Sequence, residues 1–318
     1  MKLAFQLSDV EHQKNSVVTV GSFDGVHRAH QEIIAQVVQQ ARSRQGRSVV
    51  ITFEPHPREV LTKTDGPLQL LTTLEERKRL FEQCGIDLMY VIKFDYAFSR
   101  SSSRDFYLRY VVNGVGVSEV IEGYDHHFGR DREGSVEELV RLGKEFEFSI
   151  IAVKPVYVDE EVVNSSKIRA LLNEGNVERA REFLGRPYSL SGVIIKGDGR
   201  GKQLGYPTAN IRPLSSKKLI PRNGIYFVRV DGIGKKQYGM TSIGVRPTFH
   251  TNGTIVVEVN VLNFDGDLYG HEIEIHFLKR LRDEQKFESA QALIRQMNTD
   301  KEISLKLLQD VSREQKSS

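Results

Sequence analysis

Two histidines follow a strand-like segment and a glycine turn near the start of the chain. Residues 17–20 are β-prone and lead into Gly21, after which a turn and then a helix starting near His27 are expected. Backbone N–H groups in such a turn can approach an anion, and the helix N-terminus adds partial positive charge. His27 and His30 are three residues apart, so both imidazoles project from one helix face. The pattern predicts a phosphate site; a metal half-site and an ordinary surface pair are the alternatives.

A second polar segment opens the helix expected after the last parallel strand. It contains Ser165 and Ser166, followed by a lysine and Arg169. A hydroxyl at a helix start is first of all a cap, which accounts for Ser165 alone. Two hydroxyls followed by two cations could also hold a triphosphate. His56 and the glycine-flanked loop 123–129 each follow a strand as well, where they could contact a substrate or simply end the strand.

A third group of candidates lies in the second half of the chain. A glycine-rich turn, 197–202, is followed by Thr208 and Asn210, which face the same way on an extended segment. A hydroxyl and an amide carbonyl on one face suit a Mg²⁺ ion that also holds ATP phosphates. Glu258 lies in the strand-like stretch 256–261. Carboxylates in that pattern usually face solvent, but one that points into a barrel mouth could act as a general base.

The elements that position these residues change character near residues 186–187. Before this point strand-like and helical segments alternate, which predicts an α/β doubly wound parallel sheet with ligands at the carboxyl ends of its strands. After it, strands follow one another as in a small antiparallel β-barrel, closed by C-terminal helices. Expected strands are 17–20, 49–53, 88–94, 119–122, 150–155, 189–195, 225–230, 238–243, 255–261 and 272–277. Expected helices are 31–44, 74–84, 102–112, 136–146, 165–173, 177–185, 287–297 and 301–312. The expected domains are 1–185 and 186–318.

Composition narrows the class of protein. The 318 residues include 45 basic and 42 acidic ones, and a net charge of +3 is too balanced to indicate nucleic-acid binding. No apolar run reaches membrane-spanning length, and the first fifteen residues lack the apolar core of a signal peptide. The one cysteine, Cys84, allows no disulfide within the chain. We therefore expect a cytoplasmic protein with no membrane or nucleic-acid partner.

The first half resembles the adenylyltransferases of the HIGH-type nucleotidyltransferase superfamily. Their signature, G-x-F-D-x-x-H-x-G-H, is matched by Gly21, Phe23, Asp24, His27 and His30. Residues 164–169 are similar to a second signature of that superfamily, S-S-T-x-I-R, and 123–129 to its G-x-[DN]-F-x-F-G loop. The sequence departs from these patterns at Ala29, Asn164 and His126.

The second half resembles riboflavin kinase. Its signature, G-D-x-x-G-x-x-L-G-[FY]-P-T-A-N, is matched by residues 197–210. Further matching stretches are 223–226, 243–249, 257–260, 268–270 and 282–287. Taken with the first half, the whole chain resembles the bacterial bifunctional riboflavin kinase/FAD synthetase (FMN adenylyltransferase) family.

This resemblance implies two reactions, both with ATP as co-substrate and Mg²⁺ as cofactor. The barrel would phosphorylate riboflavin to FMN, and the front domain would join FMN to AMP and release pyrophosphate. In the barrel Glu258 would be the general base, and Thr208 and Asn210 would position metal and phosphates. Other expected contacts in the barrel are Gly197, Asp198 and Lys202 with the phosphates, and Arg282 near the flavin.

In the front domain His27 and His30 would stabilise charge on the α-phosphate and the leaving pyrophosphate. Further contacts implied there are Gly21, Phe23 and Asp24 with the nucleotide, Ser165, Ser166 and Arg169 with the phosphates, and His56 and Asp125 with the flavin nucleotide or adenine.

Three alternatives remain open from the sequence. The three departures at Ala29, Asn164 and His126 allow a riboflavin kinase whose front domain is impaired or regulatory. A nucleotidyltransferase could act on another acceptor, such as a phosphopantetheine. A flavin-responsive regulator could bind RNA through basic loops, although the near-neutral charge disfavours it.

Overall fold

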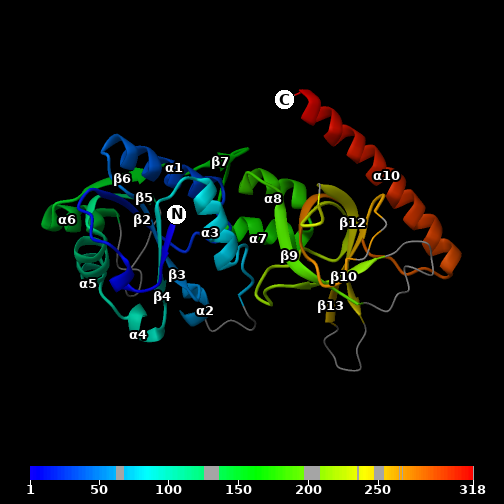
Figure 1. The fold of residues 1–318 in the computed structure, drawn as a ribbon, viewed down its shortest axis with the longest axis horizontal. Helices are drawn as coiled ribbons and strands as arrows, with labels where there is room; N and C mark the ends of the chain where they lie inside the picture. The colour runs from blue at the N-terminus through cyan, green and yellow to red at the C-terminus, as the bar shows by residue number, and fades with distance from the viewer. Residues whose placement is uncertain are drawn as a thin grey trace. The chain divides into compact units, whose positions relative to one another are not determined.

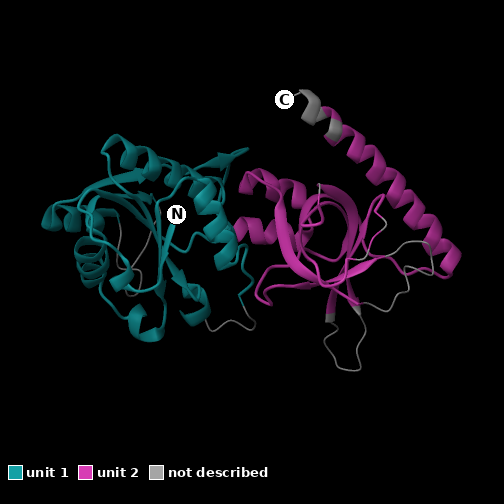
Figure 2. Cartoon of the chain, in the orientation of Figure 1, with its two compact units in different colours: residues 1–165 teal, residues 166–318 magenta. Residues whose placement is uncertain are grey.

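The computed structural model describes residues 1–61, 68–124, 136–196, 208–234, 236–246, 254–264, 266 and 268–317. Its contacts divide the chain into two compact units, residues 1–165 and 166–318 (Figure 2). The domain boundary expected after residue 185 stays a prediction. Four predicted site residues lie outside the described ranges: Asp125, Gly197, Asp198 and Lys202.

A six-stranded parallel sheet forms the centre of the first unit, in the order β1-β4-β3-β2-β5-β6. Its strands are β1 (Lys2–Ala4), β2 (Ser16–Val20), β3 (Ser48–Glu54), β4 (Leu88–Lys93), β5 (Val117–Gly123) and β6 (Ser149–Val153). The five strands expected from the sequence are confirmed, and β1 was too short to show a pattern. Strands β2, β3 and β4 progress one way across the sheet, and β5 and β6 the other. The strand order therefore reverses between β2 and β5, where doubly wound sheets bind ligands.

Helices cover both faces of this sheet, which confirms the predicted fold class. One face packs against α1 (Arg28–Ser43) and α3 (Leu74–Gln83), and the other against the π-helix η2 (Tyr107–Val115) and α6 (Val136–Phe146). Alternation along β2 explains the division, because Val17 packs on the α1 side and Val18 on the η2 side. The helix expected at 102–112 is instead the short α5 (Ser103–Phe106) followed by η2. The remaining short elements are η1 (Leu7–Asp9), α2 (Pro57–Leu61), α4 (Tyr96–Ser99), β7 (Tyr157–Val158) and β8 (Glu161–Val162).

The second unit begins with a helical hairpin and continues as a closed antiparallel barrel (Figure 1). The hairpin is α7 (Ser165–Glu174), whose first residue closes the first unit, and α8 (Val177–Leu184). The barrel order is β10-β13-β12-β11-β14-β9. Its strands are β9 (Tyr188–Ile195), β10 (Ala209–Pro213), β11 (Gly224–Asp231), β12 (Gln237–Arg246), β13 (Thr254–Val261) and β14 (Glu272–Arg282). The predicted barrel is confirmed, with β10 as a strand that the sequence marked only as an extended segment.

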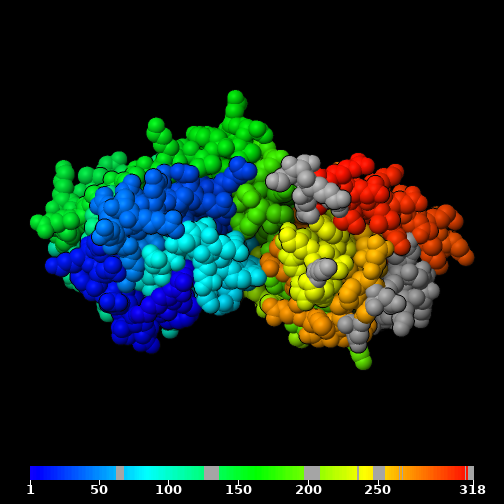
Figure 3. Space-filling view, turned by 45° about the horizontal axis from the view of Figure 1, so that its top comes forward, coloured from blue at the N-terminus to red at the C-terminus, as the bar shows by residue number. Residues whose placement is uncertain are grey.

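One long helix, α10 (Ala290–Ser317), replaces the two helices expected at 287–297 and 301–312. The break expected between these two helices covers residues 298–300, which are Asn, Thr and Asp. All three are weak helix formers. Asp300 is buried in the structure, where its carboxylate pairs with Arg282 and its carbonyl accepts from the Ser304 hydroxyl. This tertiary contact overrides the local propensity. The helix contacts β12 of the barrel (Figure 3).

Candidate active sites

The loop after β2 has an unusual backbone conformation. Phe23, Gly25 and Val26 have φ angles of 49°, 90° and 38°, in the left-handed region that a β-branched residue rarely adopts. The Phe23 ring is buried and meets the His30 ring edge-on, with centroids 5.0 Å apart. A Cβ at Gly21 would lie 3.1 Å from the Phe23 ring, so this ring fills the space beside the glycine. Packing therefore fixes the loop that the sequence marks as a phosphate site.

The two histidines lie together at the start of α1. His27 is the N-cap, and its Nδ1 accepts the backbone N–H of His30 at 3.4 Å. The two rings stack with centroids 3.6 Å apart and planes at 18°. Because an accepting nitrogen carries no proton, neutral His27 has its proton on Nε2. Within the described parts of the chain no three His, Cys, Asp or Glu side chains gather as a metal site, so the pair has no such third ligand there.

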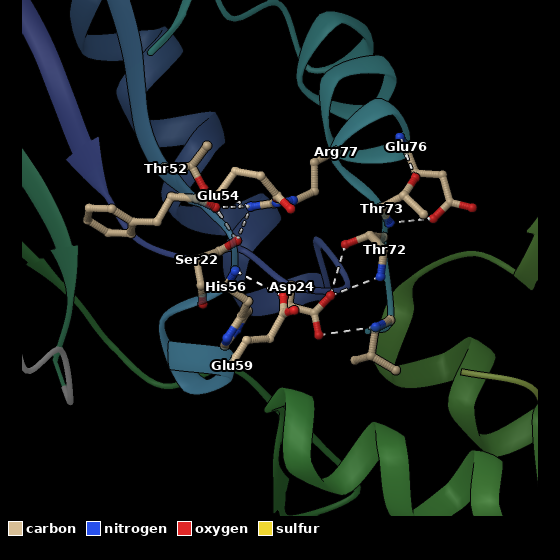
Figure 4. A network of polar contacts seen from close by, with 12 residues as sticks. Ser22, Asp24, Thr52, Glu54, His56, Glu59, Thr72, Thr73, Glu76 and Arg77 are labelled. Atoms are coloured by element: carbon tan, nitrogen blue, oxygen red, sulfur yellow. Dashed lines mark hydrogen bonds and ion pairs between the residues drawn. The ribbon is translucent and has the colours of Figure 1, made fainter. Parts of the chain in front are cut away.

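Asp24 binds protein rather than an open site. Its carboxylate is 2% exposed and accepts the backbone N–H groups of Leu71 at 3.1 Å and Thr72 at 2.9 Å, as well as the Thr72 hydroxyl (Figure 4). That hydroxyl in turn accepts the N–H of Gly25 at 2.8 Å. Asp24 therefore shapes the loop from inside. The sequence alone could not reveal this, because Leu71 and Thr72 are 47 and 48 residues away from Asp24.

Arg77 on α3 belongs to the same network, and the sequence analysis did not single it out. Its Nη1 donates to the Ser22 carbonyl and the Thr52 hydroxyl, both at 2.9 Å, and its Nη2 to Glu54 Oε2 at 2.7 Å (Figure 4). Burial lowers the pKa of Arg77, while the Glu54 carboxylate opposes this shift. A sequence signal existed: Arg77 is four residues before the fully buried Phe81, on the inward face of an amphipathic helix.

His56 lies on the segment that follows Glu54 at the end of β3. The imidazole is buried, and its Nδ1 accepts the backbone N–H of Arg58 at 3.1 Å. The His56 N–H donates to Glu59 Oε1 at 3.1 Å, so the histidine is fixed at the start of α2. Through Glu54 and Arg77 this segment is tied to the loop that carries Asp24.

The start of α7 contacts the same loop. The Ser165 hydroxyl donates to the Asp24 carbonyl at 2.9 Å, across 141 residues of sequence. The two signatures of the first half therefore meet through the Ser165 hydroxyl and the Asp24 carbonyl. Ser166 and Arg169 follow in the first two turns of α7, within the second compact unit.

A buried carboxyl lies where the strand order reverses. Glu122 of β5 is 2% exposed, and its Oε1 accepts the N–H of Val20, the last residue of β2, at 2.7 Å. Burial raises the pKa of Glu122 well above its usual value, and the hydrogen bond from Val20 acts in the opposite direction. The side chain thus ties together the two strand ends from which the Gly21 loop and the 123–129 loop depart.

In the barrel, strand pairing brings three predicted residues together. Asn210 of β10 lies directly opposite Glu258 of β13, and the Thr208 hydroxyl donates to Glu258 Oε2 at 3.1 Å. Val257 and Val259 are buried. Glu258 alternates with them and is half-buried, so it projects from the opposite face of β13. The structure places Glu258 beside Thr208 and Asn210, and its role as a general base stays a prediction.

Arg282 pairs with the C-terminal helix. Its guanidinium contacts the Asp300 carboxylate through Nε at 3.0 Å and through Nη2 at 2.7 Å, and both side chains are largely buried. The expected flavin contact of Arg282 stays a prediction.

None of the helices described is both long and apolar enough to cross a membrane.

Two family models match this chain. The FAD synthetase model matches residues 9–167, and the riboflavin kinase model matches residues 184–308. The chain belongs to the bifunctional riboflavin kinase/FMN adenylyltransferase family. A relative of that name from Listeria monocytogenes is 36% identical, over 91% of this chain and 91% of its own length. Another from Bacillus subtilis is 34% identical over 93% of each chain. The resemblance expected from the sequence motifs is confirmed.

A solved structure shares the fold across both units. A crystallised Streptococcus pneumoniae protein, named as a macrolide-efflux protein, superposes with a TM-score of 0.87 at 30% identity and covers 95% of this chain and 98% of its own. Membership in the bifunctional family favours flavin chemistry over the alternatives of another acceptor or an RNA-binding regulator.

Proposed function

We propose that the two reactions of this family take place at two separate sites in this chain. The protein is a transferase: it phosphorylates riboflavin to FMN with ATP and then adenylylates FMN to FAD, releasing pyrophosphate. We assign adenylylation to residues 1–185 and phosphorylation to residues 186–318. The observation that carries this assignment is that each half holds its own cluster of signature residues, at the Gly21 loop and on the face shared by β10 and β13.

For adenylylation, the FMN phosphate oxygen bonds to the α-phosphorus of ATP as the bond from that phosphorus to the β-phosphate oxygen breaks. The nucleophile comes from FMN, so the protein must position and neutralise charge. The Gly21 loop and the α1 N-terminus offer N–H groups, and His27 adds its Nε2–H. His30 lies against His27 and faces the same phosphates in this proposal.

The other predicted residues of the front site complete this arrangement. The opening of α7 would bind the polyphosphate through Ser165, Ser166 and Arg169. Ser165 supports this role, because it already contacts the carbonyl of Asp24. His56 and Asp125 would contact the flavin nucleotide or adenine, and Phe23 would shape the pocket from within the loop.

For phosphorylation, Glu258 accepts the proton of the riboflavin 5′-hydroxyl as that oxygen attacks the γ-phosphorus of ATP and ADP leaves. The hydrogen bond from Thr208 fixes one carboxylate oxygen, and Asn210 lies across the strand pair from the same residue. Gly197, Asp198 and Lys202 would support the phosphates, and Arg282 would lie near the flavin.

The donor set on this strand face fits Mg²⁺. Thr208 offers a hydroxyl and Asn210 an amide oxygen, and Mg²⁺ prefers hard oxygen ligands with few from protein and the rest from phosphate and water. When bound, the ion would neutralise charge on the ATP phosphates. We propose that Thr208 and Asn210 hold it there.

Product analysis tests the proposal. Purified protein with riboflavin and MgATP should form FMN first and FAD afterwards, as separated by chromatography. FMN that accumulates without FAD, even when FMN is supplied directly, would instead identify a riboflavin kinase with an impaired or regulatory front domain. The departures at Ala29, Asn164 and His126 make this outcome the one to look for.

A further inference from the structure

Arg77 is the largest fully buried side chain among the described residues, and the proposed chemistry gives it no role. Burying a guanidinium is costly unless its charge and its N–H donors are paired, so an apolar side chain of similar volume would be the simpler choice for a helix core. Here the charge is matched by the Glu54 carboxylate at 2.7 Å. The Glu54 side chain is 35% exposed, whereas that of Arg77 is 2% exposed.

The acceptors of Arg77 come from two segments that meet at the front site. One is the Ser22 carbonyl, inside the loop that follows β2. The others are the Thr52 hydroxyl and the Glu54 carboxylate at the end of β3, just before the His56 segment. One planar guanidinium therefore links the loop after β2 to the end of β3 and fixes the distance between them (Figure 4).

Helix α3 holds the Gly21 loop at a second place. The backbone N–H groups of Leu71 and Thr72, just before the helix, bind the Asp24 carboxylate. The helix start is itself fixed, because Thr73 and Glu76 form a reciprocal cap. The loop is thus held at two places. The residues just before α3 bind the Asp24 carboxylate, and Arg77 within the helix binds the Ser22 carbonyl.

We propose that Arg77 is a positioning residue for adenylyl transfer, which holds the loop 21–25 against the end of β3 so that its N–H groups and the following histidines meet the polyphosphate of ATP. This role rests on the proposed function of that loop. Lysine could keep the charge but not reach Ser22, Thr52 and Glu54 together, because it lacks the planar fork. In an Arg77→Lys variant the loop would therefore shift, although the histidines that follow it would still be present.

The test uses the full chain and two substitutions. Arg77→Lys should lower kcat for FAD formation from supplied FMN by about 10- to 100-fold, since misplacement of about 1 Å can cost that much. The KM for ATP in this reaction should rise several-fold, and the KM for FMN should stay the same. Glu54→Gln should lower kcat for FAD formation by only about threefold, because the amide oxygen can still accept a hydrogen bond from Arg77. Effects in the double variant should be less than multiplicative.

Two controls make the result decisive. Arg79→Lys makes the same change at an exposed position of the same helix and should leave both KM values and kcat unchanged. FMN formation from riboflavin, assigned to the other half, should be unaffected in every variant. A fall in kcat with both KM values unchanged and a lower melting temperature would overturn the proposal, since it would show a purely structural role. If the parent chain makes no FAD from FMN, the proposed function itself fails; if it does and both Arg77→Lys and Glu54→Gln match it, only the role of Arg77 fails.

Discussion

In the front unit Asp24 is buried and the loop that carries it is held by hydrogen bonds from distant segments, whereas in the barrel Asn210 and Glu258 are placed by strand pairing. Asp24 is fixed by Leu71 and Thr72, and Ser22 by Arg77. In the barrel the positions follow from pairing between β10 and β13, with the Thr208–Glu258 hydrogen bond added. A loop needs many anchors to hold a strained shape, but a strand ladder sets the spacing of side chains by itself. We therefore expect substitutions around the front loop to change the position of the loop and its neighbours. In the barrel we expect a substitution to remove only the chemistry of the side chain that is replaced.

The largest effect is expected at Glu258. Glu258→Gln keeps the shape and the acceptor for Thr208 but cannot take a proton, so riboflavin phosphorylation should fall by about 10²- to 10⁴-fold. FAD formation from supplied FMN should be unchanged. Initial rates of FMN and FAD formation check this, with Glu272→Gln at an exposed barrel position as the matched control. Loss of both reactions in folded protein would contradict the division between two sites.

A slightly smaller effect is expected at His30. His30→Ala removes one imidazole of the stacked pair, and loss of one group that stabilises transition-state charge typically costs about 10²- to 10³-fold in kcat. Adenylylation of FMN should fall by this amount and riboflavin phosphorylation should remain. His12→Ala, an exposed histidine of the same unit, serves as control. An unchanged rate of FAD formation would remove the pair from the proposed chemistry.

Asp24→Asn tests whether the front loop depends on its anchors. An amide places N–H groups against the backbone N–H of Leu71 or Thr72, so a buried donor loses its acceptor. We expect the free energy of unfolding of the front unit to fall by about 1–3 kcal/mol. Denaturant titration followed by FAD formation would measure it, while riboflavin phosphorylation reports on the barrel. A stability equal to that of the parent chain would show that the contacts of Asp24 are dispensable.

The smallest effect concerns Glu122 and depends on pH. Burial raises its pKa above 4.5, so the folded unit keeps a proton that the unfolded chain releases. The front unit should therefore lose stability as pH rises from about 4.5 through the folded-state pKa. Glu122→Gln mimics the protonated acid and should flatten this dependence, raising the melting temperature at alkaline pH by a few degrees, about 2–4 °C per kcal/mol. Melting curves across the pH range decide the point, and parallel curves for both proteins would contradict it.

Local patterns in the sequence were enough to predict the two architectures and most strands. Alternation of helical and strand-like segments predicted the doubly wound sheet, and uninterrupted strands predicted the barrel. The break expected near residue 300 was wrong because Asp300 is held by Arg282, a contact that helix propensity cannot register. The strand β1 was missed because three residues carry too little pattern.

The front site was predicted less completely than the fold. The turn and the histidine pair are contiguous in sequence, so spacing placed them together. Arg77 and the partners of Asp24 lie in another helix and its preceding segment, and only the folded chain brings them to the loop. In the barrel, the side on which Glu258 projects depended on which face of β13 is buried, and alternation alone cannot decide that.

The closed strand order of the barrel leaves its described strands paired on both sides, whereas the front sheet ends at β1 and β6. Unpaired strand edges are where chains add to one another through backbone hydrogen bonds. Aggregation seeded by strand addition should therefore start from the front unit. Charged substitutions meant to improve solubility belong on the exposed positions of β6, such as Ala152, rather than on the barrel.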